Sequence, residues 1–162
     1  MYLGVISDTH GIIPGTSAAI KIFQERDVRR VIHCGDIGSA AVVELFRGLT
    51  VDFVFGNCDI ARRSISEKIE EIGGTLHDDF GSVEMEGRKI AFLHGQDEER
   101  LEAEVRSQNW DLICVGHTHR RSYEQIGDAR ILNPGSIQRR FDMPSVAIVE
   151  LPKIDVCYFN VK

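Results

Sequence analysis

Two histidines separated by one residue, His117 and His119, indicate a possible metal site. The apolar run at residues 112–115 that precedes them is typical of a buried strand, and Gly116 ends it. In an extended segment residues i and i+2 point to the same side, so both imidazoles can converge on one ion. An isolated pair of this kind is more often two surface histidines. The interpretation therefore depends on whether similar residues follow other predicted strands.

Metal-competent residues do follow other apolar runs of the chain. Asp8 and His10 come after the strand predicted at residues 3–7, and Asp36 follows the strand at 30–34. Asn57 follows residues 51–55, and His94 ends a predicted hairpin. Ligand sites in α/β proteins lie at the carboxyl ends of strands, so we expect these side chains to meet. Taken singly, Asp8 could cap a helix and Asn57 could be a turn residue.

Two carboxylates, one amide and four imidazoles make up the candidate set: Asp8, His10, Asp36, Asn57, His94, His117 and His119. Seven ligands are too many for one tetrahedral ion but suit two ions about 3.5–4 Å apart, with one carboxylate shared. The set contains no thiolate, which favours Mn, Fe or Zn, with Ni or Co as alternatives. Two divalent ions against two carboxylates leave about two positive charges, enough to attract a phosphate.

The hydrophobic pattern predicts the elements that position these residues. The first half alternates strands with helices at residues 16–26, 39–46 and 64–72. A hairpin at residues 81–93, a helix at 98–107 and further strands make up the second half. We expect an α/β fold in which two mixed sheets pack as a β-sandwich with helices on their outer faces. His33, next to a strand end, is interpreted as a packed structural histidine.

Size and composition limit the classes of protein. The 162 residues suit a single domain spanning 1–162. The net charge of −6 argues against broad binding to nucleic acid or to anionic membranes. No apolar run is long enough to cross a bilayer, so we expect no membrane association. The four cysteines are scattered without a C-x-x-C pair, which favours reduced thiols and a cytoplasmic location.

The ordered motifs D-x-H, G-D, G-N-x-D, H-G and G-H-x-H resemble those of the calcineurin-like metallophosphoesterase superfamily. The short chain and the residues Asn133-Pro134-Gly135-Ser136 resemble its small bacterial and archaeal phosphodiesterase branch. This resemblance implies a four-layer αββα fold and in-line attack on phosphorus by a metal-bridging hydroxide. It also implies that small relatives form dimers or tetramers, so a homo-oligomer is expected.

The resemblance also assigns the ligands to two ions. One ion would be held by Asp8, His10, Asp36 and His119, and the other by Asp36, Asn57, His94 and His117, with Asp36 bridging. Mn is the favoured metal. The expected substrate is a small phosphodiester, contacted by Asn57 and by Arg139 or Arg140, whose guanidinium groups suit phosphate oxygens.

One position departs from the motif of many family members. Cys58 follows Asn57, where many relatives have a histidine that assists the leaving group. A thiol is a poor substitute for an imidazolium, so we expect a preference for substrates with good leaving groups.

Two other functions fit the same residues. One is a phosphomonoesterase or nucleotidase that uses the same site. The absent histidine and the lack of a long cap insertion favour diesters over this alternative. The other is a metal-binding interaction module without turnover, as in the retromer subunit that shares the fold. Because all seven ligand positions hold competent residues, the sequence favours an enzyme.

Overall fold

Two β-sheets form the centre of the computed structural model, which describes residues 1–140 and 142–162. The six-stranded sheet has the order β11-β10-β1-β2-β3-β4. Its strands are β1 (Tyr2–Ile6), β2 (Arg30–His33), β3 (Thr50–Phe53), β4 (Thr75–Leu76), β10 (Ser145–Glu150) and β11 (Asp155–Asn160). Strands β1 to β4 are parallel, and β10 runs antiparallel to both β1 and β11.

The five-stranded sheet has the order β5-β6-β7-β9-β8. Its strands are β5 (Phe80–Met85), β6 (Arg88–Leu93), β7 (Leu112–Cys114), β8 (Arg121–Ile126) and β9 (Ala129–Pro134). Strands β6, β7 and β9 are parallel, whereas β5 and β8 are antiparallel edge strands. Both sheets are therefore mixed, as the sequence predicts.

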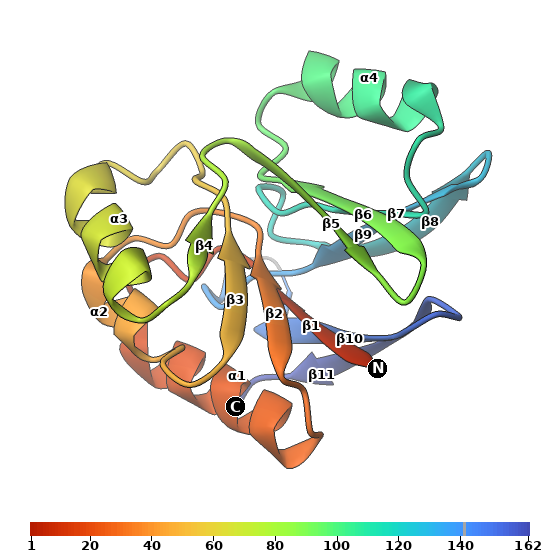
Figure 1. Cartoon of the computed structure of the whole chain (residues 1–162). Helices are drawn as coiled ribbons and strands as arrows, with labels where there is room; N and C mark the ends of the chain where they lie inside the picture. The colour runs from red at the N-terminus through yellow and green to blue at the C-terminus, as the bar shows by residue number, and fades with distance from the viewer. Residues whose placement is uncertain (141) are drawn as a thin grey trace.

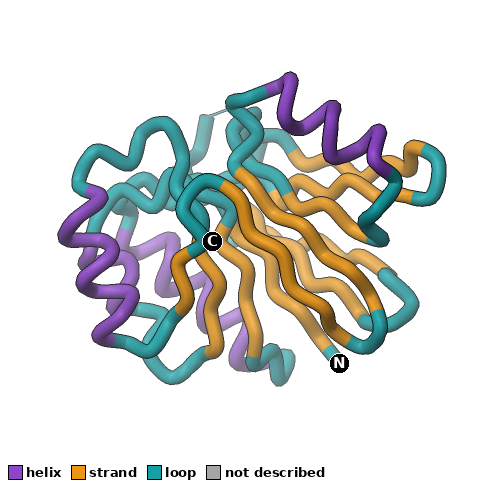
Figure 2. Tube along the Cα trace, turned by 45° about the horizontal axis from the view of Figure 1, so that its top comes forward, coloured by secondary structure: helices purple, strands orange, loops and turns teal. Residues whose placement is uncertain are grey.

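Helices cover the outer faces of both sheets (Figure 1). Helices α1 (Ile13–Glu25), α2 (Ala40–Glu44) and α3 (Arg62–Glu71) lie on the six-stranded sheet, and α4 (Glu98–Ser107) lies over the other. Figure 2 shows the two sheets stacked between these helical layers. The structure therefore has the predicted four layers, helix–sheet–sheet–helix.

Three apolar clusters fill the three interfaces between these layers. Phe23, Phe46 and Phe53 belong to the cluster between the six-stranded sheet and its helices. A second cluster, which includes Leu3 and Phe92, lies between the two sheets. The third joins the five-stranded sheet to α4, none of whose residues is fully buried. The cores thus hold the sheets together and fix the positions of the loops at the strand ends.

Most predicted elements are present, with shifted ends. Helix α1 begins at Ile13 rather than at Thr16, because proline is tolerated in the first turn of a helix and Pro14 lies there. The predicted cap of α2 is confirmed, since the Ser39 side chain accepts a hydrogen bond from Val42 N. Strand β4 was not predicted, because its two residues are too few to show an alternating pattern.

No helix in residues 1–140 and 142–162 combines the length and the apolarity needed to span a membrane.

Candidate metal centre

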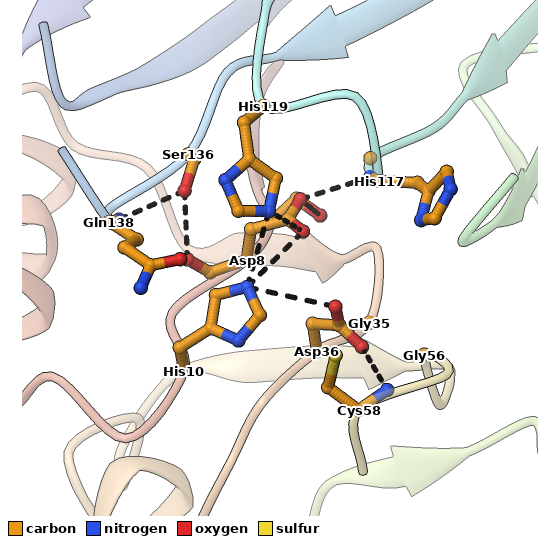
Figure 3. A network of polar contacts seen from close by, with 12 residues as sticks. Asp8, His10, Gly35, Asp36, Gly56, Cys58, His117, His119, Ser136 and Gln138 are labelled. Atoms are coloured by element: carbon orange, nitrogen blue, oxygen red, sulfur yellow. Dashed lines mark hydrogen bonds and ion pairs between the residues drawn. The ribbon is translucent and has the colours of Figure 1, made fainter. Parts of the chain in front are cut away.

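Loops from both sheets bring four of the predicted ligands to one point (Figure 3). Asp8 and His10 follow β1, Asp36 follows β2, and His119 follows β7. One potential ligand atom of each lies within 4.8 Å of those of the other three. Three of the four residues are buried, and His10 is partly exposed. The carboxyl ends of strands in both sheets therefore converge, as the sequence predicts for ligands that follow each strand.

The nitrogen atoms of three imidazoles face the two carboxylates. His119 Nε2 lies 3.0 Å from Asp8 Oδ1, and His10 Nε2 lies 3.6 Å from both Asp8 Oδ1 and Asp36 Oδ2. His94, at the end of β6, has its Nε2 atom 3.2 Å from Asp36 Oδ2 and 4.0 Å from Asp8 Oδ1. The predicted ligand His94 therefore lies beside the other four.

Two atoms at the centre of this group are buried and lack a hydrogen-bond partner among the described residues. They are Asp8 Oδ1 and His94 Nε2. Buried polar atoms are normally paired, and an unpaired one costs free energy. The Nδ1 atom of His94 donates to the carbonyl oxygen of Cys34 at 2.7 Å, which leaves the Nε2 lone pair directed at the cluster. The donor set therefore fits divalent cations.

The charges of this cluster shift the pKa values of its members. The nearby Asp8 carboxylate raises the pKa of His10, although burial opposes this. Burial acts to lower the pKa of His94, but Asp36 and Asp8 raise it above its ordinary value. Burial acts to raise the pKa of Asp36, but His94 and the Cys58 backbone amide hold it well below its usual range. The carboxylates thus favour positive charge at this point.

Five candidate ligands adopt the left-handed backbone conformation, which non-glycine residues rarely take. They are Asp8, His10, Asp36, His117 and His119, with φ values of 54°, 44°, 53°, 67° and 59°. Each such residue costs on the order of 1–3 kcal/mol, and such residues cluster at functional sites. The fold therefore maintains a strained backbone in order to direct these side chains.

Close backbone packing requires glycine beside Asp36. Gly35 has φ +92°, and a Cβ atom there would lie 2.8 Å from Gly56 N and 2.9 Å from His94 Nδ1. A Cβ atom at Gly56 would collide with Asp36 Oδ1 and with its backbone nitrogen. The Gly-Asp and Gly-Asn motifs therefore let the loops after β2 and β3 pack against each other.

Asn57 and His117 lie at the exposed rim of the cluster. The His117 ring makes an edge contact with the His94 ring, with the centroids 5.2 Å apart, and in Figure 3 it points away from Asp8. Asn57 Nδ2 lies 3.5 Å from Cys58 Sγ. Both residues therefore border the site, but their side chains do not join the close group around Asp8.

Three polar residues whose roles the motifs do not predict hold the loops that carry the candidate ligands. Asp59 is buried and accepts hydrogen bonds from Gly38 N and Gly56 N, each at 2.8 Å. Its only signal in the sequence is the last position of the G-N-x-D motif.

The other two come from the Asn133-Pro134-Gly135-Ser136 segment that follows the apolar part of β9. Asn133 Nδ2 donates to Gly116 O at 2.7 Å, and Ser136 Oγ donates to Asp8 O at 3.1 Å. The segment thus connects the loops of β7 and β1.

His33 is the structural histidine that the sequence predicts. Its ring is fully buried and stacks against Phe53. Nδ1 accepts a hydrogen bond from Gly35 N at 3.2 Å, so Nε2 carries the proton and donates to Thr9 Oγ1 at 2.9 Å. Burial lowers the pKa of His33 to about 3, which keeps the ring neutral. The neutral ring joins the loops after β1 and β2.

The predicted substrate residues lie on exposed parts of the chain around the cluster. Burial lowers the pKa of His119, and Asp8 opposes this effect. The positive charges of His10 and Arg140 lower it further. Arg139 is exposed beside Arg140. Cys58 is exposed, and its backbone N–H donates to Asp36 Oδ1 at 2.8 Å.

Comparison with known proteins identifies the family of this chain. Residues 1–153 match the calcineurin-like phosphoesterase superfamily domain. Phosphodiesterase MJ0936 of Methanocaldococcus jannaschii is 34% identical over 157 residues, which are 94% of this chain and 95% of that protein. The chain therefore belongs to the calcineurin-like phosphoesterase superfamily. The predicted family, and with it the enzyme class of phosphoesterases, is confirmed.

Solved structures confirm the fold class. A structure described as a novel archaeal phosphodiesterase has a TM-score of 0.92 and 33% identity, and covers 99% of both chains. Vps29 of Chaetomium thermophilum has a TM-score of 0.71 at 17% identity, with 99% of this chain and 96% of that chain covered. The second likeness shows the shared fold alone.

Proposed function

We propose that this chain is a phosphodiesterase that uses two divalent metal ions. The first ion is held by Asp8, His10, Asp36 and His119, and the second by Asp36, Asn57, His94 and His117, so that Asp36 is shared. Manganese is the proposed metal, because the donor set consists of carboxylate, amide and imidazole groups without a thiolate.

The observation that carries this proposal is the pair of buried, unpartnered atoms Asp8 Oδ1 and His94 Nε2. They lie 4.0 Å apart, and the Nε2 atoms of His10 and His119 are within 3.6 Å of the same Asp8 oxygen. Cations between these atoms would satisfy them. The Methanocaldococcus jannaschii relative is named a phosphodiesterase, which supports the activity.

Bound metal ions would supply a nucleophilic water at neutral pH and would polarise the phosphate oxygens. The chain itself provides the orientation of the substrate. We assign the exposed amide of Asn57 and the guanidinium groups of Arg139 and Arg140 to contacts with the phosphate. The charge of Arg140 contributes to the lowered pKa of His119, which supports this assignment.

Cys58 supports a diester over a monoester substrate. Burial, followed by the charge of Asp36, raises the pKa of this thiol, so it is a weak proton donor beside the site. Substrates whose leaving group departs without strong acid assistance suit such a site.

The test is hydrolysis of a chromogenic phosphodiester and of its monoester by the protein after metal stripping and readdition of Mn, Ni, Zn or Mg. We expect metal-dependent diester cleavage that is lost in Asn57→Ala and kept in Asn109→Ala, a control at another exposed asparagine. Faster monoester turnover would instead identify a phosphatase. Metal binding without turnover of either substrate would favour an interaction module.

We further propose that residues 1–162 form one domain and that the protein acts as a cytoplasmic homo-oligomer on small diesters. The length of the chain supports a single domain, and the scattered cysteines support a reducing compartment. The resemblance to small family members supports a homo-oligomer.

A further inference from the structure

The two oxygens of the Asp8 carboxylate have different surroundings. Oδ2 accepts hydrogen bonds from Ser7 Oγ at 2.6 Å and from His117 N at 3.1 Å. Oδ1 is buried and accepts none among the described residues, although His119 Nε2 lies 3.0 Å away. A carboxylate with one oxygen occupied in this way presents only the other oxygen to a cation.

Loops from both sheets pack against Ser7. Its side chain is fully buried at the end of β1, and its Oγ atom lies 3.3 Å from Cys34 O after β2. A hydroxyl has one proton, and the shorter contact directs it to Asp8. A Cβ atom at Gly116 would collide with Ser7 Oγ, so the loop after β7 needs glycine to close over this pair.

We propose that Ser7 is a positioning residue that makes Asp8 a one-oxygen metal ligand, by holding Oδ2 together with the backbone N–H of His117. This inference rests on the metal centre of the proposed function, but not on its turnover or its substrate. The hydrogen bonds fix the carboxylate plane before an ion arrives. They also occupy the oxygen that Asp8 would need in order to chelate an ion with both oxygens.

Such partners of ligands are worth about 10–100-fold in metal affinity. Ser7→Ala removes the shorter of the two bonds to Oδ2 and adds no bulk. We therefore expect the ion assigned to Asp8, His10 and His119 to bind about 10–100-fold more weakly, while the ion assigned to Asn57, His94 and His117 is little affected.

Ser145→Ala is the matched control. Ser145 is also fully buried, and its Oγ donates at 2.6 Å to Pro134 O rather than to a ligand. Calorimetric titration of the metal-stripped proteins with Mn²⁺ would give both affinities, with urea unfolding as a check on folding. The inference predicts a selective loss at one site in Ser7→Ala and no such loss in Ser145→Ala. Unchanged affinities in Ser7→Ala, or equal losses in both variants, would overturn it.

A crystal structure of the Mn-loaded wild-type protein tests the same point if Ser7→Ala does not fold. We expect Asp8 to bind through Oδ1 alone while Ser7 remains on Oδ2, and chelation through both oxygens would refute the inference. A protein that binds metal in this way but cleaves no diester would end the proposed function and leave the role of Ser7 standing.

Discussion

His94 donates through Nδ1 to the backbone carbonyl of Cys34 at 2.7 Å. The carbonyl can only accept, so this bond assigns a proton to Nδ1, and in the neutral ring Nε2 carries the lone pair. That lone pair faces Asp36 Oδ2 at 3.2 Å. The backbone that follows β2 in the six-stranded sheet thus sets the tautomer of His94, a candidate ligand that follows β6 in the five-stranded sheet. This prepares the site for a cation.

Metal binding should therefore stabilise the fold. A ligand at a hundred times its Kd adds about 2.7 kcal/mol to the free energy of unfolding. For a chain of this size that corresponds to a rise in Tm of about 5–10 °C. We expect this rise when Mn²⁺ is added to the metal-stripped protein, and we expect Asp36→Asn to abolish it because the proposal assigns Asp36 to both ions.

Asp52→Asn is the control for a buried carboxylate outside the site. Asp52 pairs with Arg30 at 2.9 Å and with His77 at 2.9 Å. This variant should lower Tm in both conditions and keep the Mn²⁺-dependent rise, as measured by calorimetry. A rise that survives in Asp36→Asn would contradict the shared-ligand assignment.

Much of the fold could be predicted because strands such as β1, β6 and β7 are short apolar runs followed by polar residues or glycine. The helix at Glu98–Ser107 was predicted with its observed bounds, since its cap Asp97 and its periodic Leu101 and Val105 are local signals. Strand β4 could not be predicted, because Thr75–Leu76 is a strand only through its pairing with β3.

In the candidate site, too, some residues could be predicted from local patterns and others could not. Spacing within motifs was enough to select candidate ligands such as Asp8, His10 and His119, which the structure brings together. The residues that hold them depend on contacts between distant segments, such as Ser136 with Asp8 and Asn133 with Gly116. No local pattern records such contacts, so their roles required the structure.

Arg139 and Arg140 should contribute to substrate binding rather than to the chemical step. A charge-assisted hydrogen bond contributes about 1.5–3 kcal/mol, so the double alanine variant should raise KM about tenfold or more with little change in kcat. Steady-state kinetics on a chromogenic diester measures this split.

The control is the double variant Arg29→Ala and Arg106→Ala. These arginines pair with Asp27 and Glu102, and their removal changes the net charge by the same amount. An equal rise of KM in both double variants would show that only overall charge matters. An unchanged KM in the first variant would remove the assigned role.

His33 should make stability depend on pH. Its folded pKa of about 3 is lower than the ordinary 6.5, so between these values the unfolded chain binds a proton at His33 that the folded chain does not. Stability therefore falls as pH falls through this window, by up to about 1.4 kcal/mol per pH unit from this group.

His33→Gln removes this contribution while keeping a polar side chain near Thr9. We would measure urea unfolding of the metal-stripped proteins between about pH 4.5 and 6, which lies within about two units of the ordinary histidine pKa. The free energy of unfolding should depend less steeply on pH in the variant. The comparison concerns the slope, so a constant loss of stability in His33→Gln does not affect it. Parallel curves for the two proteins would show that folding does not lower the pKa of His33.

Replacement of Cys58 tests how the site treats its leaving group. Cys58 holds Asp36 through its backbone N–H, and its side chain is exposed, so a substitution there leaves the hydrogen bond at 2.8 Å in place. Burial and then Asp36 raise the pKa of the thiol, which makes it a weaker acid than a histidine. A positioned general acid contributes about 10²–10⁴-fold to the rate. We therefore expect Cys58→His to accelerate the cleavage of an alkyl diester by about tenfold or more, with little effect on a nitrophenyl diester.

Cys58→Ser, which provides no such acid, should leave the ratio of the two rates as in the wild-type protein. If Cys58→His leaves that ratio unchanged as well, the position takes no part in leaving-group departure.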